Sequence, residues 1–191
     1  GGPYEMTVQG KTTVVLKNVL VGEVWVCSGQ SNMQWNVGSA KNAKEEIAAA
    51  NYPQIRLFHV PNTTSETPRT TVNAKWVVCT PQTVPGFTAV GYFFGRDLHK
   101  ALKVPVGLIG TSWGGTAAEA WTSMEKLQAD PDYQPMLDRW EQIAANYPQN
   151  LEKYNKETIP AWEKAVAEAK AAGKPEPRKP SPPPDRLNPN Y

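Results

Sequence analysis

The sequence is poor in the side chains that usually bind metals, because its 191 residues include only two histidines and two cysteines. Cys27 and Cys79 form no Cys-x-x-Cys pair and have no histidine cluster nearby, which excludes the usual zinc patterns. Both cysteines occur in strand-like segments, so two buried free thiols and one disulfide bond both remain open. We therefore expect no metal site.

The sequence also lacks a long apolar run and a large excess of charge. No segment approaches the roughly 20 apolar residues of a membrane-spanning helix, so we expect no membrane partner. The formal net charge is only +2 and the basic residues are scattered, which argues against nucleic acid as a partner. The chain opens on Gly-Gly-Pro without the basic and apolar regions of a signal peptide. With 40% hydrophobic residues, the composition indicates one main globular domain.

The first segment, residues 4 to 21, alternates apolar and polar residues around the turn Gln9-Gly10-Lys11. This pattern predicts a β-hairpin. A lone hairpin is not stable in water, and the sequence begins without a methionine in the middle of the pattern. We therefore interpret residues 1–21 as the end of a preceding β-rich domain.

The chain is organised around a strand that runs directly into a polar turn. Residues 24 to 27, Val-Trp-Val-Cys, are followed by Ser-Gly-Gln-Ser-Asn, which is typical of a buried strand that ends at a sheet edge. Ligands of α/β sheets bind outside the carboxyl ends of strands, where Ser31 would present its hydroxyl to a substrate. The alternative is that Ser28 and Ser31 merely cap the next helix.

The rest of the chain alternates strand and helix patterns, which predicts an α/β fold with a parallel sheet flanked by helices. The predicted elements are a helix at 40–50 with Ser39 as its cap, strands at 54–60 and 73–79, a core helix at 87–102 and a strand at 104–110. The patterns at 124–146 and 151–172 predict a helical hairpin, inserted at residues 123–172. The proline-rich residues 173–191 favour an extended connector over a ligand for an SH3-like partner.

A second polar turn follows the strand at 104–110 and reads Trp113-Gly114-Gly115-Thr116. Its glycines allow backbone N–H groups to approach a substrate oxygen closely, although they also suit a tight turn. The same region contains Gly110-Thr111-Ser112-Trp113-Gly114, which fits the Gly-x-Ser-x-Gly nucleophile elbow of α/β-hydrolases. Ser112 is thus the alternative nucleophile.

Two blocks of the sequence resemble a known family. GEVWVCSGQSNMQW, from Gly22 to Trp35, is similar to the nucleophile block of the sialate O-acetylesterase family, carbohydrate esterases of the flavodoxin-like SGNH-hydrolase type. GLIGTSWGGTAAEAW, from Gly107 to Trp121, resembles the Trp-Gly-Gly-Thr segment of that family. The resemblance implies a flavodoxin-like sheet, here incomplete, with residues 22–122 as the first part of the esterase domain.

The resemblance also implies roles for single residues. It favours Ser31 over Ser112 as the nucleophile that forms the acyl-enzyme. The backbone N–H groups of Ser31 and of Gly114 or Gly115 would then form the oxyanion hole, without any cofactor. Further residues are expected to bind the sugar, two of them tryptophans that can stack on a sugar ring: Gln30, Asn32, Trp35, Trp113 and Thr116.

The sequence contains no recognisable catalytic base for Ser31. SGNH esterases take their base from an Asp-x-x-His near the end of the domain, and neither this tetrad nor the family's Gln-Gly-Glu-x-Asn segment occurs here. His59 and His99 lie in strand and helix patterns, and we expect both to be too far from Ser31 to form a hydrogen bond. The expected partner is the C-terminal part of the same esterase, in the same or a second chain, which covers an apolar face or strand edge near Ser31.

The predicted function is therefore a serine esterase that removes O-acetyl groups from a sugar, with sialic acid as the expected substrate. The isolated chain is predicted to be inactive. The resemblance further implies an exported protein that is secreted, periplasmic or lysosomal. The alternatives are an esterase that uses Ser112 and a carbohydrate-binding module without catalytic activity.

Overall fold

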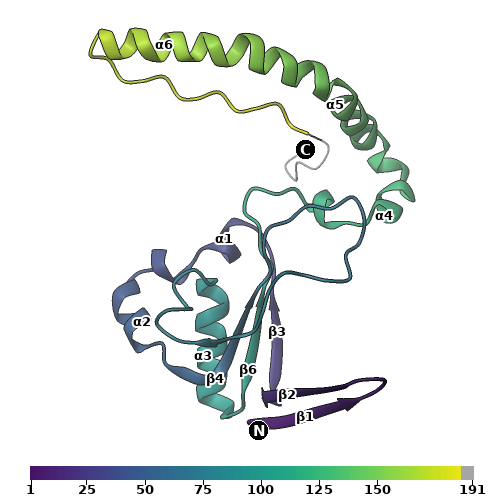
Figure 1. The fold of residues 1–191 in the computed structure, drawn as a ribbon, viewed down its shortest axis with the longest axis vertical. Helices are drawn as coiled ribbons and strands as arrows, with labels where there is room; N and C mark the ends of the chain where they lie inside the picture. The colour runs from purple at the N-terminus through teal and green to yellow at the C-terminus, as the bar shows by residue number, and fades with distance from the viewer. Residues whose placement is uncertain (186–191) are drawn as a thin grey trace. The chain divides into compact units, whose positions relative to one another are not determined.

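A computed structural model of the chain describes residues 1–185, which divide into two compact units (Figure 1). The first unit contains residues Gly1–Thr63 and Thr67–Thr116, and it holds every strand described below. The second contains residues 64–66 and the described residues from 117 onward.

The first unit is built on a four-stranded sheet with the strand order β3-β6-β4-β5. The strands are β3 (Glu23–Cys27), β6 (Val106–Gly110), β4 (Tyr52–His59) and β5 (Val77–Cys79). β6 pairs in parallel with both β3 and β4, so the prediction that the strand before Ser31 and the strand before the glycine turn are neighbours is confirmed. Their carboxyl ends are level, because Gly110 is in register with both Cys27 and His59.

The prediction of an all-parallel sheet is wrong at β5, which pairs with β4 in the antiparallel direction. Residues 60 to 76 join these two strands and contain no helix. A parallel neighbour requires a long crossover, usually a helix, whereas a loop that returns directly produces an antiparallel pair. The sheet is therefore mixed and mostly parallel.

The core lies between this sheet and α3 (Ala89–Leu102), whose position matches the predicted core helix (Figure 1). Ile55, Leu57 and Leu108 project from β4 and β6 into this layer and are almost completely buried. The helix approaches β6 closely because Gly95 faces Leu108, where a Cβ atom would lie 2.6 Å from the Leu108 Cδ1 atom.

The predicted helix with Ser39 as its cap is shorter than expected. α2 (Ala43–Ala49) follows Asn42, which adopts a left-handed conformation and makes no side-chain cap. Ser39 instead ends the short 3-10 helix η1 (Val37–Ser39), and its N–H donates to Asn36 Oδ1 at 2.9 Å. Asn36 thus caps η1, and no side chain takes the capping role at α2 that the sequence suggested for Ser39.

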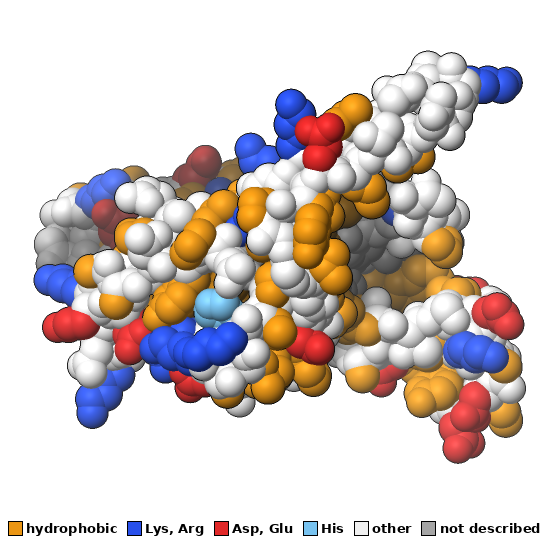
Figure 2. Space-filling model, turned by 90° about the horizontal axis from the view of Figure 1, so that it is seen from below, with side chains coloured by type: hydrophobic (Ala, Val, Ile, Leu, Met, Phe, Trp, Pro, Cys, Tyr) orange, Lys and Arg blue, Asp and Glu red, His pale blue; other side chains and the backbone are white. Residues whose placement is uncertain are grey.

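The other face of the sheet is only partly covered within residues 1–185, where Trp76 packs on Phe58 and lies close to Gly107. Val24 and Val26, on the edge strand β3, have 61% and 64% of their surface exposed. The exposure of these two valines agrees with the expected apolar strand edge near Ser31. That the C-terminal part of the same esterase covers this edge stays a prediction. The predicted hairpin is also present as β1 (Tyr4–Gln9) and β2 (Thr13–Val19), and most of its apolar side chains are exposed. Figure 2, which views the molecule from the end where the hairpin lies in Figure 1, shows hydrophobic side chains at the surface.

Gly22 allows the close approach of the chain before β3 to the chain before β6. A Cβ atom on Gly22 would lie 2.1 Å from the Pro105 carbonyl oxygen, which also accepts a hydrogen bond from the Glu23 N–H. We expect Gly22→Ala to lower the free energy of unfolding by about 1–3 kcal/mol, because the two strands must separate to admit the methyl group. Chemical denaturation measures this. Gly10→Ala is the control, since its Cβ would meet no atom nearer than 3.8 Å, and equal losses in both variants would contradict the prediction.

The two cysteines are free thiols, which settles the alternatives left open by the sequence. Cys27 lies on β3 and Cys79 on β5, at opposite edges of the sheet. Three strand spacings separate them by about 14 Å, whereas a disulfide joins Cα atoms no more than ~7 Å apart. Burial raises the pKa of the Cys79 thiol to about 11 and also raises that of Cys27, so both thiols are protonated at neutral pH.

The second unit contains one long helical run in place of the predicted helical hairpin. After η2 (Ala118–Trp121), α4 (Met124–Gln128) and η3 (Pro131–Tyr133), α5 (Gln134–Lys153) continues through a π-helical turn (Tyr154–Thr158) into α6 (Ile159–Ala171). The expected break between residues 146 and 151 is wrong because α5 runs through these residues, with Pro148 inside it. A proline removes one backbone donor, and the helix continues when neighbouring bonds and packing compensate.

The helix packs instead against the proline-rich segment, which runs back along it (Figure 1). Trp162 Nε1 donates a hydrogen bond to the Pro177 carbonyl at 3.0 Å, and the Tyr154 hydroxyl donates to the Pro180 carbonyl at 2.9 Å. The described part of the predicted connector is therefore bound to the π-helical turn and to α6, and residues 186–191 lie outside the described residues. Within residues 1–185, no helix is both long and apolar enough to cross a membrane.

Candidate active site

Ser31 lies on a strand-to-helix turn. β3 ends at Cys27 and α1 (Ser31–Gln34) begins at Ser31, with Gln30 in the N-cap position. No side chain caps this helix, so neither serine of the turn has the capping role that the sequence left open. Gly29 has a φ of 145°, which only glycine adopts readily, and this conformation turns the chain sharply after the strand.

Backbone hydrogen bonds hold the two polar turns together beyond the strands. The Thr111 N–H donates to the Cys27 carbonyl and the Trp113 N–H donates to the Gly29 carbonyl, each at 3.0 Å. Gly114 consequently lies directly against the serine: a Cβ atom on this residue would be 3.2 Å from the Ser31 Oγ atom. The two turns that the sequence singled out therefore meet at one end of the sheet, as expected.

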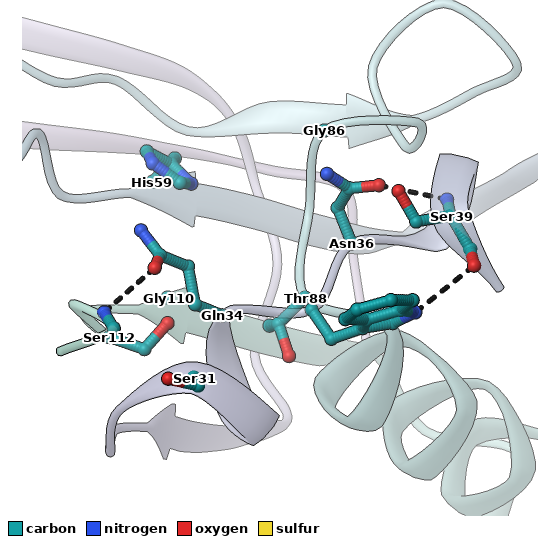
Figure 3. A pocket seen from close by; sticks show the side chains of 11 residues that line it. Ser31, Gln34, Asn36, Ser39, His59, Gly86, Thr88, Gly110 and Ser112 are labelled. Atoms are coloured by element: carbon teal, nitrogen blue, oxygen red, sulfur yellow. Dashed lines mark hydrogen bonds between the residues drawn. The ribbon is translucent and has the colours of Figure 1, made fainter. Parts of the chain in front are cut away.

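A pocket of about 510 Å³ opens at this end of the sheet (Figure 3). Of the residues predicted to form the site, Ser31, Gly114 and Trp35 line it. The rival nucleophile Ser112 lines it as well. The other lining residues are Gln34, Asn36, Ser39, His59, Gly86, Thr88 and Gly110.

The remaining predicted residues lie around the pocket but are not part of its lining. Gln30 accepts a hydrogen bond from the Ser31 hydroxyl at 3.3 Å. The Thr116 hydroxyl is buried and donates to the Trp113 carbonyl at 2.8 Å, which holds the glycine turn closed. Gly115 has a φ of 80°, which favours glycine at this position, so the shape of the turn requires a glycine there. Sugar-binding roles for Gln30, Asn32, Trp113 and Thr116 stay predictions.

His59 is the only ionisable side chain among the described residues that line the pocket. The sequence analysis did not place His59 at the site, although it is the last residue of β4, and the carboxyl end of a parallel strand is where ligands of α/β sheets bind. No hydrogen bond among residues 1–185 joins Ser31 to His59 or His99, as expected. His99 Nδ1 is instead hydrogen-bonded with the Val104 carbonyl at 2.7 Å, at the far end of α3.

The loop before α3 supplies pocket residues that the sequence analysis missed. The Val37 N–H donates to the Phe87 carbonyl at 3.0 Å, and the Ala89 N–H donates to the Trp35 carbonyl at 2.8 Å. These bonds bring Gly86 and Thr88 to the pocket, although nothing in their local sequence indicates it. Trp35 keeps 58% of its surface exposed, and its Nε1 donates to the Ser39 carbonyl at 3.1 Å. Its ring is thereby oriented and remains open to a ligand.

The structural context differs between the two candidate nucleophiles. A nucleophile elbow is a sharp strand-turn-helix junction. Ser112 follows β6, but residues 111–117 contain no helix. Ser31 follows β3 and opens α1. The context that supports an elbow is therefore present at Ser31 and missing at Ser112.

No group of three or more histidine, cysteine or acidic side chains within residues 1–185 is placed to bind a metal ion. The pocket lining offers hydroxyl groups, amide groups, backbone N–H groups, one imidazole and an indole. These groups suit a polar ligand with a ring face, and they provide a hydroxyl beside backbone donors.

The fold and the pocket define an α/β protein whose polar site lies at the carboxyl ends of parallel strands, with a serine at the junction of strand and helix. The sequence profile of the family described as "Carbohydrate esterase, sialic acid-specific acetylesterase" matches residues 21–154. The chain belongs to this family.

Individual relatives agree with this assignment. The chain is 39% identical to mouse sialate O-acetylesterase and 38% identical to the human enzyme, each over 143 residues that cover 68% of the chain. A crystal structure of a carbohydrate acetylesterase from Xanthomonas citri matches with a TM-score of 0.63 and 40% identity, and it covers 70% of this chain. The matched regions are 26% of the mouse protein, 27% of the human protein and 31% of the Xanthomonas chain. The chain thus spans about a quarter of the length of its curated relatives.

Proposed function

We propose that this chain carries the nucleophile part of a carbohydrate O-acetylesterase. Ser31 attacks the carbonyl carbon of an acetyl ester, the sugar hydroxyl leaves, and the acetyl-enzyme is then hydrolysed by water. The N–H groups of Ser31 and of Gly114 or Gly115 stabilise the negative oxygen of the tetrahedral intermediate. Trp35 provides a ring face for the sugar.

One observation carries this proposal: Gly114 lies against Ser31, with its Cβ position only 3.2 Å from the Ser31 Oγ atom. An oxyanion hole needs a donor close to the nucleophile, on a residue whose own side chain does not block the approach. A glycine next to the serine meets both requirements, and the bonds between the turns hold it there. Family membership supports the same chemistry.

The proposal places the base and its acidic partner outside these 191 residues. A serine hydroxyl needs a base within hydrogen-bond reach, and in residues 1–185 the Ser31 hydroxyl bonds only to Gln30. We propose that the rest of a longer esterase supplies an Asp-x-x-His, completes the flavodoxin-like SGNH sheet beside β3 and acts in an exported compartment. We call that complete polypeptide the longer esterase.

The substrate is tested by measuring acetate release from an O-acetylated sialic acid and from a neutral acetylated sugar. We expect the longer esterase to release acetate from both, with the sialic acid ester preferred, as the names of the curated relatives suggest. A protein without Ser31 (Ser31→Ala) is the matched control. Preference for the neutral sugar would contradict the sialic acid assignment alone. Absence of release from either would contradict the esterase and support a carbohydrate-binding module.

A further inference from the structure

The backbone donor next to the nucleophile is already occupied in this structure. The Gly114 N–H donates a hydrogen bond to Gln34 Oε1 at 2.7 Å, and the ideal Cβ position of Gly114 lies 2.7 Å from the same oxygen. Gln34 is the last residue of α1, the helix that Ser31 opens, and it lines the pocket. Figure 3 shows Gln34, Ser31 and Ser112 around the same end of the pocket.

A carboxamide oxygen and an ester carbonyl oxygen make the same demand on an N–H donor. Each is an sp² oxygen that accepts a hydrogen bond at about 2.9 Å. Since the Gln34 oxygen lies on Gly114, beside the Ser31 hydroxyl, it occupies the place that the ester oxygen needs if Gly114 is a donor of the oxyanion hole.

We propose that Gln34 is a positioning residue that fills the oxyanion site of the substrate-free protein and leaves it when an acetyl group binds. This inference rests on the proposed function, since it takes Gly114 as the oxyanion donor. Without an acyl group in the site, the Gln34 oxygen accepts the hydrogen bond of the Gly114 N–H. This bond keeps the N–H oriented toward Ser31. On binding, the acyl oxygen replaces the Gln34 oxygen on Gly114.

The surroundings of Gln34 allow this exchange. Gln34 is exposed to solvent, and within residues 1–185 its carboxamide makes no other hydrogen bond. The side chain can therefore rotate into water without a change in the backbone, and water then satisfies its polar groups. Each binding event must first break one neutral hydrogen bond, so the placeholder weakens acyl binding.

The first test uses the 191-residue chain and acetate, whose carboxylate oxygen competes with Gln34 for the Gly114 N–H. The Gly114 amide signal in NMR spectra of ¹⁵N-labelled protein reports the occupancy of this donor. We expect Gln34→Ala to move the free-state signal and to bind acetate about 2- to 12-fold more tightly, the factor that corresponds to a net hydrogen bond of ~0.5–1.5 kcal/mol. Gln34→Glu should bind acetate more weakly than the unaltered chain, because a second carboxylate then occupies the donor.

Gln82→Ala provides the matched control, since Gln82 is also an exposed glutamine of the first unit but does not line the pocket. It should leave both the Gly114 signal and the acetate affinity unchanged. Unchanged or weaker acetate binding by Gln34→Ala would overturn the proposal. So would the absence of any acetate-dependent shift of the Gly114 signal in that variant.

A kinetic test in the longer esterase separates this inference from the proposed function. Gln34→Ala should lower KM for an acetyl ester while kcat changes little, because the acyl oxygen of the bound substrate no longer has to displace the Gln34 oxygen from the Gly114 N–H. A fall in kcat with unchanged KM would contradict the placeholder role while leaving the esterase intact. If Ser31→Ala keeps full turnover, the proposed function fails, and the acetate titration still reports whether Gln34 occupies Gly114.

Discussion

Replacing Ser31 with alanine in the longer esterase is expected to lower acetyl ester turnover by about 10⁴-fold or more, because the proposed nucleophile of the acyl-enzyme is then missing. The fold should persist, since Ser31 is exposed and its hydroxyl makes only a long hydrogen bond of 3.3 Å to Gln30. Acetate release under saturating substrate measures the loss. Circular dichroism of the variant confirms that the loss does not come from unfolding.

Ser112→Ala is the matched control for this experiment. Both serines line the pocket, but only Ser31 opens a helix after a strand. We expect the Ser112 variant to keep most of its activity, with an effect no larger than that of a lost substrate contact. The reverse ranking would assign the nucleophile to Ser112 and would make the protein an esterase of the α/β-hydrolase type.

The purified 191-residue chain is expected to release acetate about 10⁴-fold more slowly than the longer esterase. A serine without a base is a weak nucleophile, and the Ser31 hydroxyl has no imidazole partner within residues 1–185. The measurement compares initial rates at equal protein concentration. Melting curves show whether the isolated chain is folded under the conditions of the assay.

Full turnover by the isolated chain would contradict the need for a second part of the protein. His59 would then be the candidate base, because it is the one ionisable side chain among the described residues that line the pocket. Loss of that activity in His59→Gln, with His99→Gln unaffected, would identify it. His99 suits the comparison because its ring bonds to the Val104 carbonyl and does not line the pocket.

The sequence alone predicted those elements whose character depends on short-range patterns. The apolar runs of β3 and β6 and the periodic stripe of α3 each indicate an element within a few residues of its observed bounds. The pairing of β3 with β6 was also predicted, because two functional turns must lie at the same edge of one sheet to act together. The family resemblance favoured Ser31 over Ser112, and it left the oxyanion donor open between Gly114 and Gly115.

Other features depend on contacts between residues that are far apart in the chain. The gap between the helical patterns at 146 and 151 predicted a break, but the helix continues through it and binds the proline-rich segment through Trp162 and Tyr154. The antiparallel direction of β5 follows from the path of its loop, which the strand pattern does not contain. Local propensity is a weak guide wherever tertiary packing offers compensating bonds.

The pocket shows this division most clearly. The sequence determined that Ser31 ends a turn after a strand and that glycines follow a second strand. Only the tertiary structure decided that His59 and Thr88 join them, and that Gln34 reaches a backbone donor 80 positions away in the chain. A hydrophobic period encodes which face of an element is buried. It does not encode which loops meet at the end of a sheet, because that depends on the order in which the strands pair.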